Sequence, residues 1–393
     1  AMVQATAWTL WVPPDTMFFS GGGSLRPAEG RSLLGVVLDR HGAPLPAAGK
    51  VCADAASAWL VRDAAQRRPF AKLVARAGIP WVRERLRWGD VEAREGTFAW
   101  GKYDDVADAL AAEGVRICQV WHDTPAWTHP GEKERHAPDD LRAVYRFTRA
   151  AAQHFKGRIQ AWEIWNEPDI FFWHELADRY AALARAAAAG LRAGDPAALV
   201  LNGSLCSGVT PFARGVTDAG VLEACDRFNW HLYKPPAEYP RELAAYRALA
   251  TRAGAPVLPA WMTEAGIRLR GTEGEGNRLL DRAGLAAQCR FVAPSVVMSL
   301  AAGNERHFFF VLPDYLENGI QFGALRPDLT PHPAFLALSA AANVLGEGDY
   351  LGRLPVAGAE AHLFRTPRGR VLVAWADHET ELAVPVDGAA ATV

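Results

Sequence analysis

The sequence predicts an α/β protein: a (β/α)8 TIM barrel with a small β-sandwich domain formed by the C-terminal segment and an N-terminal strand. Three observations predict this class. Short strand-like runs alternate with helix-like stretches along the middle of the chain, as they do around a parallel sheet. Each strand-to-strand step takes roughly 30 to 50 residues, which suits one strand and one helix. A glycine often stands between the two, because glycine accepts the left-handed conformation that ends many helices.

Eight runs rich in β-branched and aromatic residues are the expected strands. In chain order they are residues 33–39, 79–88, 115–121, 159–165, 198–205, 227–233, 257–263 and 306–312. The segments between them carry apolar residues at intervals of three and four, which is the helical period. The expected helices are residues 57–77, 102–113, 139–155, 175–193, 242–253 and 278–300. Eight such units fit a closed barrel over about residues 31–346.

A doubly wound open sheet is the structural alternative to the barrel. Such a sheet normally carries a glycine-rich phosphate loop after its first strand, and none follows residues 33–39. The glycines at 21–23 precede that run and are typical of a flexible link. The barrel is therefore the favoured interpretation.

The two ends of the chain predict the β-sandwich. Residues 8–12 would place Trp8, Leu10 and Val12 on one side of a strand, and the runs 362–365 and 370–376 flank a turn at 366–369. Residues 379–386 are a further strand candidate. We therefore expect three parts: residues 1–30 as an N-terminal strand segment that joins the sandwich, 31–346 as the barrel, and 347–393 as the small sandwich. Both ends of the sequence have the character of cut ends.

Composition narrows the classes of function. The formal net charge of −2 disfavours electrostatic binding to nucleic acid or to an anionic membrane. The longest apolar stretch, residues 291–302, is interrupted by Pro294 and Ser295, so no membrane span is expected. The five cysteines form no CxxC pair, which argues against a disulfide framework or a zinc knuckle. No signal peptide is visible, and localisation and oligomeric state stay open. The 14 tryptophans suit stacking on sugar rings as well as core packing.

Two carboxylates stand where a barrel places its chemistry, at the carboxyl ends of strands. Glu167 follows the fourth expected strand, and Glu264 follows the seventh. Two carboxylates that face each other across a barrel mouth are what the cleavage of a glycosidic bond needs. The aromatic residues around Glu167 favour a raised pKa and a proton donor. Glu264 needs a cation or hydrogen-bond donors to stay ionised, which Arg83, Arg85, Arg87 and Tyr233 could supply. Glu163 is expected as a structural partner of one arginine.

Several motifs resemble clan A of the glycoside hydrolases, and family 39 and its relatives in particular. Trp165-Asn166-Glu167-Pro168 closely resembles the acid/base motif of the clan, and residues 263–266 resemble its nucleophile strand. Further similar stretches are residues 81–100, 124–127, 229–233, 322–325 and 331–334. The resemblance covers roughly residues 30–345 and implies a (β/α)8 barrel.

The resemblance also implies roles for single residues. Glu167 would be the acid/base and Glu264 the nucleophile of a retaining glycosidase, which works by double displacement. Asn166 would bind the sugar 2-hydroxyl, Arg83 would hold Glu264, and His231 and Tyr233 would line the pocket. The chain departs from the clan at the eighth strand, where many members carry a tryptophan platform and this sequence has phenylalanines at 308–310.

Further sugar-binding candidates are His122, Trp127 and Trp173, for which plain packing is the alternative. Trp59 and Trp375 are expected in the core. No metal-ligand spacing is present, so neither a metal nor a cofactor is expected. The expected partner is a carbohydrate with β-linked, or equivalent α-L-linked, bonds. Two alternatives stay open: a transglycosylase that uses the same site, and a carbohydrate-binding pseudoenzyme.

Overall fold

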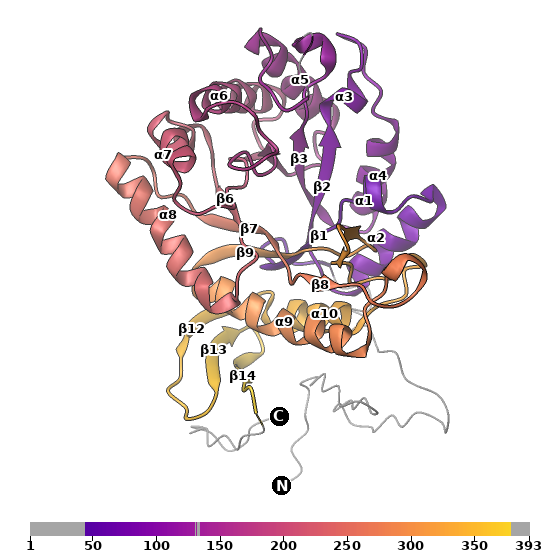
Figure 1. Ribbon diagram of the computed structural model, residues 1–393, viewed down its shortest axis with the longest axis vertical. Coiled ribbons are helices and arrows are strands. Elements are labelled where there is room, and N and C mark those ends of the chain that lie inside the picture. The colour runs from indigo at the N-terminus through magenta and orange to yellow at the C-terminus, as the bar shows by residue number, and fades with distance from the viewer. Residues whose placement is uncertain (1–43, 130, 132–133, 379–393) are drawn as a thin grey trace.

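Eight parallel strands form a ring at the centre of the molecule (Figure 1). The computed structural model describes residues 44–129, 131 and 134–378. The strands are β1 (Val51–Asp54), β2 (Trp81–Arg87), β3 (Arg116–His122), β4 (Ala161–Ile164), β5 (Leu199–Leu201), β6 (Phe228–His231), β7 (Ala260–Ala265) and β9 (Asn304–Phe309). They pair in the order β5-β4-β3-β2-β1-β9-β7-β6, and two parallel bridges, Leu201 to Arg227 and Leu205 to Trp230, join β5 to β6. The predicted barrel fold is confirmed.

The first strand of the barrel does not lie where the sequence predicts it. β1 pairs with β2 on one side and with β9 on the other, so residues 51–54 hold the first place in the ring. The prediction of residues 33–39 for that place was wrong, and those residues lie outside the described part of the chain. β1 has only four residues, Val-Cys-Ala-Asp, all of them buried. A run this short, with small residues, gives little strand signal.

Helices surround the ring of strands (Figure 1). They are α1 (Ser57–Leu60), α2 (Arg67–Arg76), α3 (Trp88–Val91), α4 (Gly101–Ala112), α5 (Leu141–His154), α6 (Ala177–Gly194), α7 (Pro211–Asp218), α8 (Tyr239–Ala253), α9 (Arg282–Ala301) and α10 (Pro333–Leu345). Short 3-10 turns are η1 (Ala64–Gln66), η2 (Ala126–Thr128), η3 (Leu222–Ala224), η4 (Pro236–Glu238) and η5 (Glu275–Asn277). The helix expected at 57–77 is broken, because the Asp63 side chain accepts from the Ala65 N–H and starts a new turn. α7 and α10 were not predicted.

α5 begins at a capping residue and buries one apolar face, as its sequence pattern predicts. The Asp140 side chain caps its start by accepting from the Arg142 N–H. Val144, Phe147 and Ala151 follow at helical spacing and are buried against the barrel. α9 is long and apolar enough to cross a membrane by length and composition alone. Half of its most apolar window is buried, and it packs against α10 and β9 as a core helix does.

Two small antiparallel sheets complete the fold. β8 (Leu269–Arg270), β10 (Leu316–Glu317) and β11 (Ile320–Gln321) form one from the segments that follow β7 and β9. β12 (Asp349–Arg353), β13 (Glu360–Thr366) and β14 (Gly369–Trp375) form the other, beside α9 and α10 (Figure 1). The hairpin predicted at 366–369 is confirmed, because Thr366 pairs with Gly369. The strand candidates at 8–12 and 379–386 lie outside the described residues, so the sandwich stays a prediction.

The inside of the barrel changes from apolar to charged along the strands. At the amino ends, Trp81 meets Trp261 edge to face, with ring centroids 5.2 Å apart, and Phe308 packs beside Trp261. Two residues further along β2, Arg83 points into the same interior, and Arg85 follows it. An apolar floor therefore supports a layer of charges under the carboxyl ends of the strands. The five cysteines, all within the described residues, are free.

Candidate active site

Glu167 lies on a sharp turn directly after β4. Trp165 and Glu167 both have positive φ angles, 75° and 43°, in the left-handed region that non-glycine residues rarely adopt. The Glu167 N–H donates to Ser204 Oγ at 3.2 Å, so the end of β5 supports this turn. Gly203 permits the close approach, because a Cβ there would lie 2.4 Å from both Ile164 O and Tyr180 Oη. The backbone strain is thus balanced by contacts that aim the Glu167 side chain.

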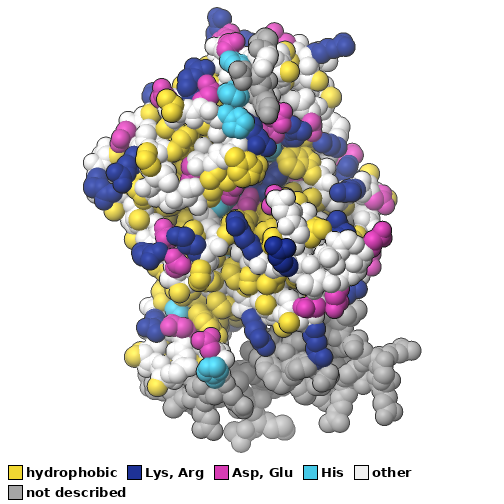
Figure 2. All heavy atoms as spheres, in the orientation of Figure 1, with side chains coloured by type: hydrophobic (Ala, Val, Ile, Leu, Met, Phe, Trp, Pro, Cys, Tyr) yellow, Lys and Arg dark blue, Asp and Glu magenta, His cyan; other side chains and the backbone are white. Residues whose placement is uncertain are grey.

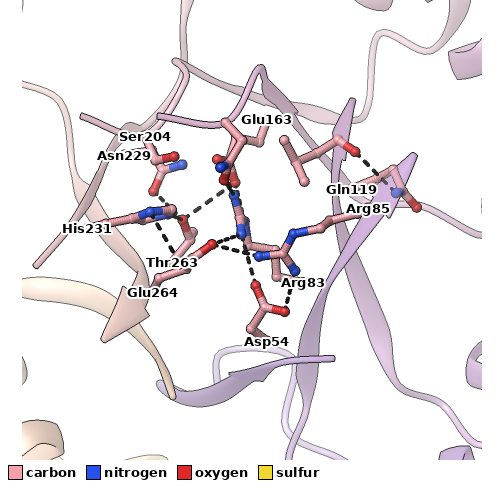
Figure 3. Close-up of polar contacts among 12 residues, drawn as sticks. Asp54, Arg83, Arg85, Gln119, Glu163, Ser204, Asn229, His231, Thr263 and Glu264 are labelled. Atoms are coloured by element: carbon pink, nitrogen blue, oxygen red, sulfur yellow. Dashed lines mark hydrogen bonds and ion pairs between the residues drawn. The ribbon is translucent and has the colours of Figure 1, made fainter. Parts of the chain in front are cut away.

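Glu264 lies near the carboxyl end of β7 and accepts three hydrogen bonds, of which Figure 3 shows the two from Arg83 and Arg85. Arg83 Nη1 donates to Oε1 at 2.5 Å, and Arg85 Nη2 donates to the same oxygen at 2.7 Å. Tyr233 Oη donates to Oε2 at 2.6 Å. The expected contact between Arg83 and Glu264 is present, and Arg85 shares it. The structure therefore places two positive charges against one carboxylate oxygen.

Arg83 is the centre of this network and is fully buried. Its Nε and Nη2 donate to the two carboxylate oxygens of Glu163 at 2.6 and 2.7 Å. Nη1 also donates to Asp54 at 2.9 Å, and Nη2 also donates to Asn166 Oδ1 at 2.7 Å. The predicted pairing of Glu163 with an arginine is confirmed. A buried guanidinium surrounded by acceptors in this way fixes the positions of all of them.

The two carboxyl groups have pKa values that move in opposite directions. Burial raises the pKa of Glu167, and this effect outweighs the opposing influence of His231. Burial would raise the pKa of Glu264 as well, but the charges of His231, Arg83 and Arg85 outweigh it, together with the hydrogen bond from Tyr233. They hold the pKa of Glu264 well below its usual range. At neutral pH, Glu264 is ionised, and Glu167 holds its proton to higher pH than an ordinary glutamate.

His231 connects the two carboxyl groups. Its Nδ1 lies 2.8 Å from Glu167 Oε1 and 3.6 Å from Glu264 Oε2. Its Nε2 lies 2.9 Å from Thr263 Oγ1, and the Thr263 hydroxyl donates to Asn229 Oδ1 at 2.7 Å. Because that hydroxyl proton is already used, Nε2 must be the donor to Thr263. Nδ1 then lies between the two carboxyl groups, closer to Glu167 than to Glu264.

A cavity of about 720 Å³ lies above these groups. Glu167 and Glu264 line it, and so do three of the predicted sugar-binding residues, Asn166, His122 and Tyr233. Arg83 and His231 do not line the cavity, because both are fully buried beneath the carboxylates that they contact. Figure 2 shows acidic and basic side chains in a hollow of the surface with apolar side chains around it.

Two predicted sugar-stacking residues lie outside this cavity. Trp127 donates from its indole to Glu92 O at 2.8 Å and packs edge-on against Trp88. Trp173 is 5% exposed and packs against Trp165 and Tyr180. Both rings are engaged in packing contacts, and neither lines the cavity.

Sequence reasoning missed several residues that line the cavity. Trp59, expected in the core, lies on the cavity wall with its ring edge-on to His122. The other missed aromatic residues are Phe171, Phe172, Phe310, Tyr315 and Phe322. Phe310 directly follows β9, and Tyr233, Tyr315 and Phe322 pack around its ring. The run at 308–310 was the available signal, and phenylalanine thus stands at the end of the eighth barrel strand.

One group of three potential metal ligands was found in the described part of the chain. Side-chain donor atoms of Glu167, His231 and Glu264 lie within 4.8 Å of one another. Arg83 and Arg85 point their charges at the same Glu264 oxygen. Because two guanidinium groups contact Glu264 directly, they oppose the approach of a metal cation. The arrangement therefore suits acid/base chemistry by side chains better than metal binding.

Comparison with known proteins agrees with the predicted resemblance. The family model "Glycosyl hydrolase family 10" matches residues 62–176, a segment that includes Glu167. Endo-1,4-beta-xylanase A of Phanerodontia chrysosporium is 26% identical over 131 residues, 30% of this chain and 31% of that protein. A beta-1,4-xylanase of Dictyoglomus thermophilum is 24% identical over 87 residues, 21% of this chain and 24% of that protein. The matches span about a quarter to a third of these relatives.

Solved structures agree with the fold over most of the chain. A family 39 glycoside hydrolase from Bacteroides cellulosilyticus superposes with a TM-score of 0.66 at 18% identity, covering 83% of this chain and 71% of that one. A family 39 beta-xylosidase from Caulobacter crescentus gives a TM-score of 0.56 at 18% identity, covering 82% and 78%. The barrel fold is thus shared, and the predicted resemblance to clan A is confirmed.

Proposed function

We propose that the chain is a retaining glycoside hydrolase that cleaves β-linked, or stereochemically equivalent α-L-linked, bonds in oligo- or polysaccharides. One observation carries the proposal: two carboxyl groups of opposite pKa shift meet in one cavity. A carboxylate oxygen of Glu167 lies within 4.8 Å of a carboxylate oxygen of Glu264. Retaining enzymes hold their carboxyl groups about 5 Å apart, whereas inverting enzymes leave about 6.5–9.5 Å for a water molecule. The short separation favours the retaining route.

The reaction takes two displacements. In the first, Glu264 attacks the anomeric carbon while Glu167 gives its proton to the leaving oxygen, so that a glycosyl–enzyme ester forms and the glycosidic bond breaks. In the second, water attacks the same carbon from the side that the leaving group has vacated. Glu167, now ionised, takes the proton of that water, and Glu264 is released as a carboxylate.

The surrounding residues prepare each carboxyl group for its role. Arg83, Arg85 and Tyr233 keep Glu264 ionised and fix its orientation. Asn166 Oδ1 accepts from Arg83 at 2.7 Å, so the amide NH2 of Asn166 is the end that faces the cavity. An amide donor beside the nucleophile suits the sugar 2-hydroxyl, a contact that strengthens in the transition state. Tyr233 also lines the cavity and can contact the same sugar.

Xylose-containing chains are the first substrates to test. The similar proteins include two xylanases and a beta-xylosidase. The cavity offers Trp59, Phe171 and Phe310 as apolar surfaces on which a sugar ring can stack. Flat apolar walls around polar catalytic groups are typical of carbohydrate sites.

The test is a hydrolysis screen with the variant Glu264→Ala in parallel. The substrates are aryl β-D- and α-L-glycosides and β-1,4-xylo-oligosaccharides. We expect the wild type to release nitrophenol from one aryl glycoside and to form first the product with the anomeric configuration of the substrate, as detected by NMR. Glu264→Ala should lose this activity by roughly 10⁴-fold or more, and added azide should restore part of it as a glycosyl azide.

Four outcomes would change the proposal. Full activity in Glu264→Ala would exclude Glu264 as the nucleophile. First products of inverted configuration would exclude the retaining route. Binding of an oligosaccharide without any product would indicate a carbohydrate-binding protein, and new oligosaccharides at high acceptor concentration would indicate a transglycosylase.

A further inference from the structure

A second cavity of about 690 Å³ adjoins the catalytic cavity, and we name it the side compartment. The two cavities share Trp59, His122, Asp123 and Phe172 as lining residues. Trp59 and His122 pack edge to face, with ring centroids 5.4 Å apart. A carbohydrate bound over Glu167 and Glu264 can therefore extend a substituent past these shared residues into the side compartment.

Among the residues that the structure describes, the side compartment is lined by more cations than acids. The charged lining residues are Arg62, Arg87, Lys102 and Arg135 against Asp90, Asp123 and Glu134. All three acids are already paired inside the compartment. Arg87 contacts Asp123 at 3.0 Å and Glu134 at 3.2 Å, and Lys102 contacts Asp90 at 2.9 Å. Among the residues that the structure describes, this leaves the guanidinium groups of Arg62 and Arg135 without a carboxylate partner.

Arg135 is held in a defined orientation. Its Nη1 donates to Phe171 O at 3.0 Å, and its guanidinium carbon lies 5.6 and 5.2 Å from the ring centroids of Phe171 and Phe172. The two aromatic contacts position the guanidinium group and leave most of its five N–H donors available. Arg62 comes directly after Val61, which ends α1, and its side chain is exposed at the rim of the compartment.

We propose that the side compartment binds a carboxylate carried by the carbohydrate substrate, such as a hexuronic acid substituent, and so makes the enzyme prefer acidic oligosaccharides. This inference rests on the proposed function, because it assigns a substrate class to the same cleft. A planar guanidinium matches a carboxylate through two parallel hydrogen bonds, which gives geometric selectivity as well as attraction. Because Arg62 is exposed, salt weakens the preference.

The test compares three oligosaccharides that differ in one substituent. They are xylotriose, xylotriose with one glucuronic acid branch, and xylotriose with one sulfate ester. The measured quantity is kcat/KM of each charged sugar divided by kcat/KM of plain xylotriose. For the wild type, the ratio for the glucuronic acid sugar should exceed one, fall as salt is added, and drop about fivefold in Arg62→Gln.

Arg68→Gln is the matched control. Arg68 is exposed in α2 and lines neither cavity, so this variant removes the same charge nearby. It should keep the wild-type ratio. A glucuronic acid ratio of one or less in the wild type would overturn the inference, as would an equal ratio in Arg62→Gln. A sulfate ratio above the glucuronic acid ratio would overturn the assignment of a carboxylate.

A binding measurement separates this inference from the proposed function. In the variant Glu264→Gln, calorimetry should show tighter binding of the glucuronic acid sugar than of plain xylotriose, with the difference reduced by the additional change Arg62→Gln. This result would support the binding of an acidic ligand in the side compartment even if no hydrolysis were found. Hydrolysis of both sugars with equal kcat/KM would leave the proposed function standing and remove the inference.

Discussion

The pair Glu167 and Glu264 determines how activity should depend on pH. The pKa of Glu264 is lowered, so we expect kcat/KM to rise with pH well below neutrality, as the proposed nucleophile ionises. The pKa of Glu167 is raised, so the acid form survives above the usual range of a glutamate, and activity falls only as pH passes through that raised value. We expect a bell-shaped profile of kcat/KM whose basic limb disappears in Glu167→Gln with an activated aryl leaving group. The exposed Glu113→Gln should keep the wild-type profile. A basic limb that persists in Glu167→Gln would assign it to another group.

Arg83 is the residue whose loss should cost the most stability. It is fully buried and donates to Asp54, Glu163, Glu264 and Asn166. Arg83→Met leaves three buried carboxylates without their main counter-charge, and we expect about 3–5 kcal/mol less unfolding free energy in urea titrations. Arg146→Met is the control, because Arg146 makes one exposed ion pair with Glu95 and should lose no more than about 1 kcal/mol. Equal losses in the two variants would contradict a central role for Arg83.

Single-residue patterns in the sequence predicted the charged centre better than the aromatic walls. The positions of Glu167, Glu264 and Arg83 could be predicted from local rules. A residue at the carboxyl end of a barrel strand faces the mouth of the barrel, and alternation along the strand decides which side chains point inward. Whether a tryptophan lines a cavity depends on its three-dimensional neighbours. Trp127 and Trp173 pack against other rings, while Trp59 lines both cavities. No local pattern distinguishes these cases.

At the scale of elements, the contact between the ends of β4 and β5 positions Glu167. Ser204 Oγ accepts from the Glu167 N–H, and Gly203 lets β5 approach closely enough for this contact. Gly203→Ala would place a Cβ 2.4 Å from Ile164 O, so we expect about 1–3 kcal/mol of destabilisation and a lower kcat from a displaced Glu167. Thermal unfolding and steady-state kinetics measure both effects.

Gly101→Ala is the matched control for this glycine. Gly101 begins α4, and a Cβ there would meet nothing within 4 Å. Its replacement by alanine should keep kcat and leave stability unchanged or slightly higher. If Gly203→Ala behaved like Gly101→Ala, the close approach of β5 would not be needed to position Glu167.

Length alone did not decide how well a strand could be predicted. β4 and β6 have four residues, as β1 has, and were expected where they lie, because aromatic and β-branched residues mark them. β1 has the small residues Cys52 and Ala53 at its centre and was placed too early in the chain. The sheet of β8, β10 and β11 consists of two-residue strands, which no sequence period can reveal. This sheet nevertheless contributes to the candidate site, because Glu317 and Ile320 line the same cavity as Glu167 and Glu264.

At the scale of the whole molecule, the repeated strand–helix unit was the basis for predicting the barrel fold. A parallel strand followed by a helix must bury both faces of the strand, and eight repeats of that requirement close into a ring. The register at which the ring closes depends on contacts between distant segments, such as Leu201 with Arg227, and could not be read from any single unit.

The apolar layer at the base of the barrel restricts where substrates enter and products leave. Trp81 and Trp261 seal the interior at the amino ends of the strands, and Arg306 covers both rings from 4.6 and 4.7 Å. Because side chains fill the barrel below the charged layer, the first product leaves by the mouth of the barrel, where water or another sugar arrives to finish the proposed reaction. We therefore expect competitive inhibition by the released product and, at high sugar concentration, a growing share of longer chains among the products. Initial-rate kinetics with added product and chromatography of the product mixture would show both.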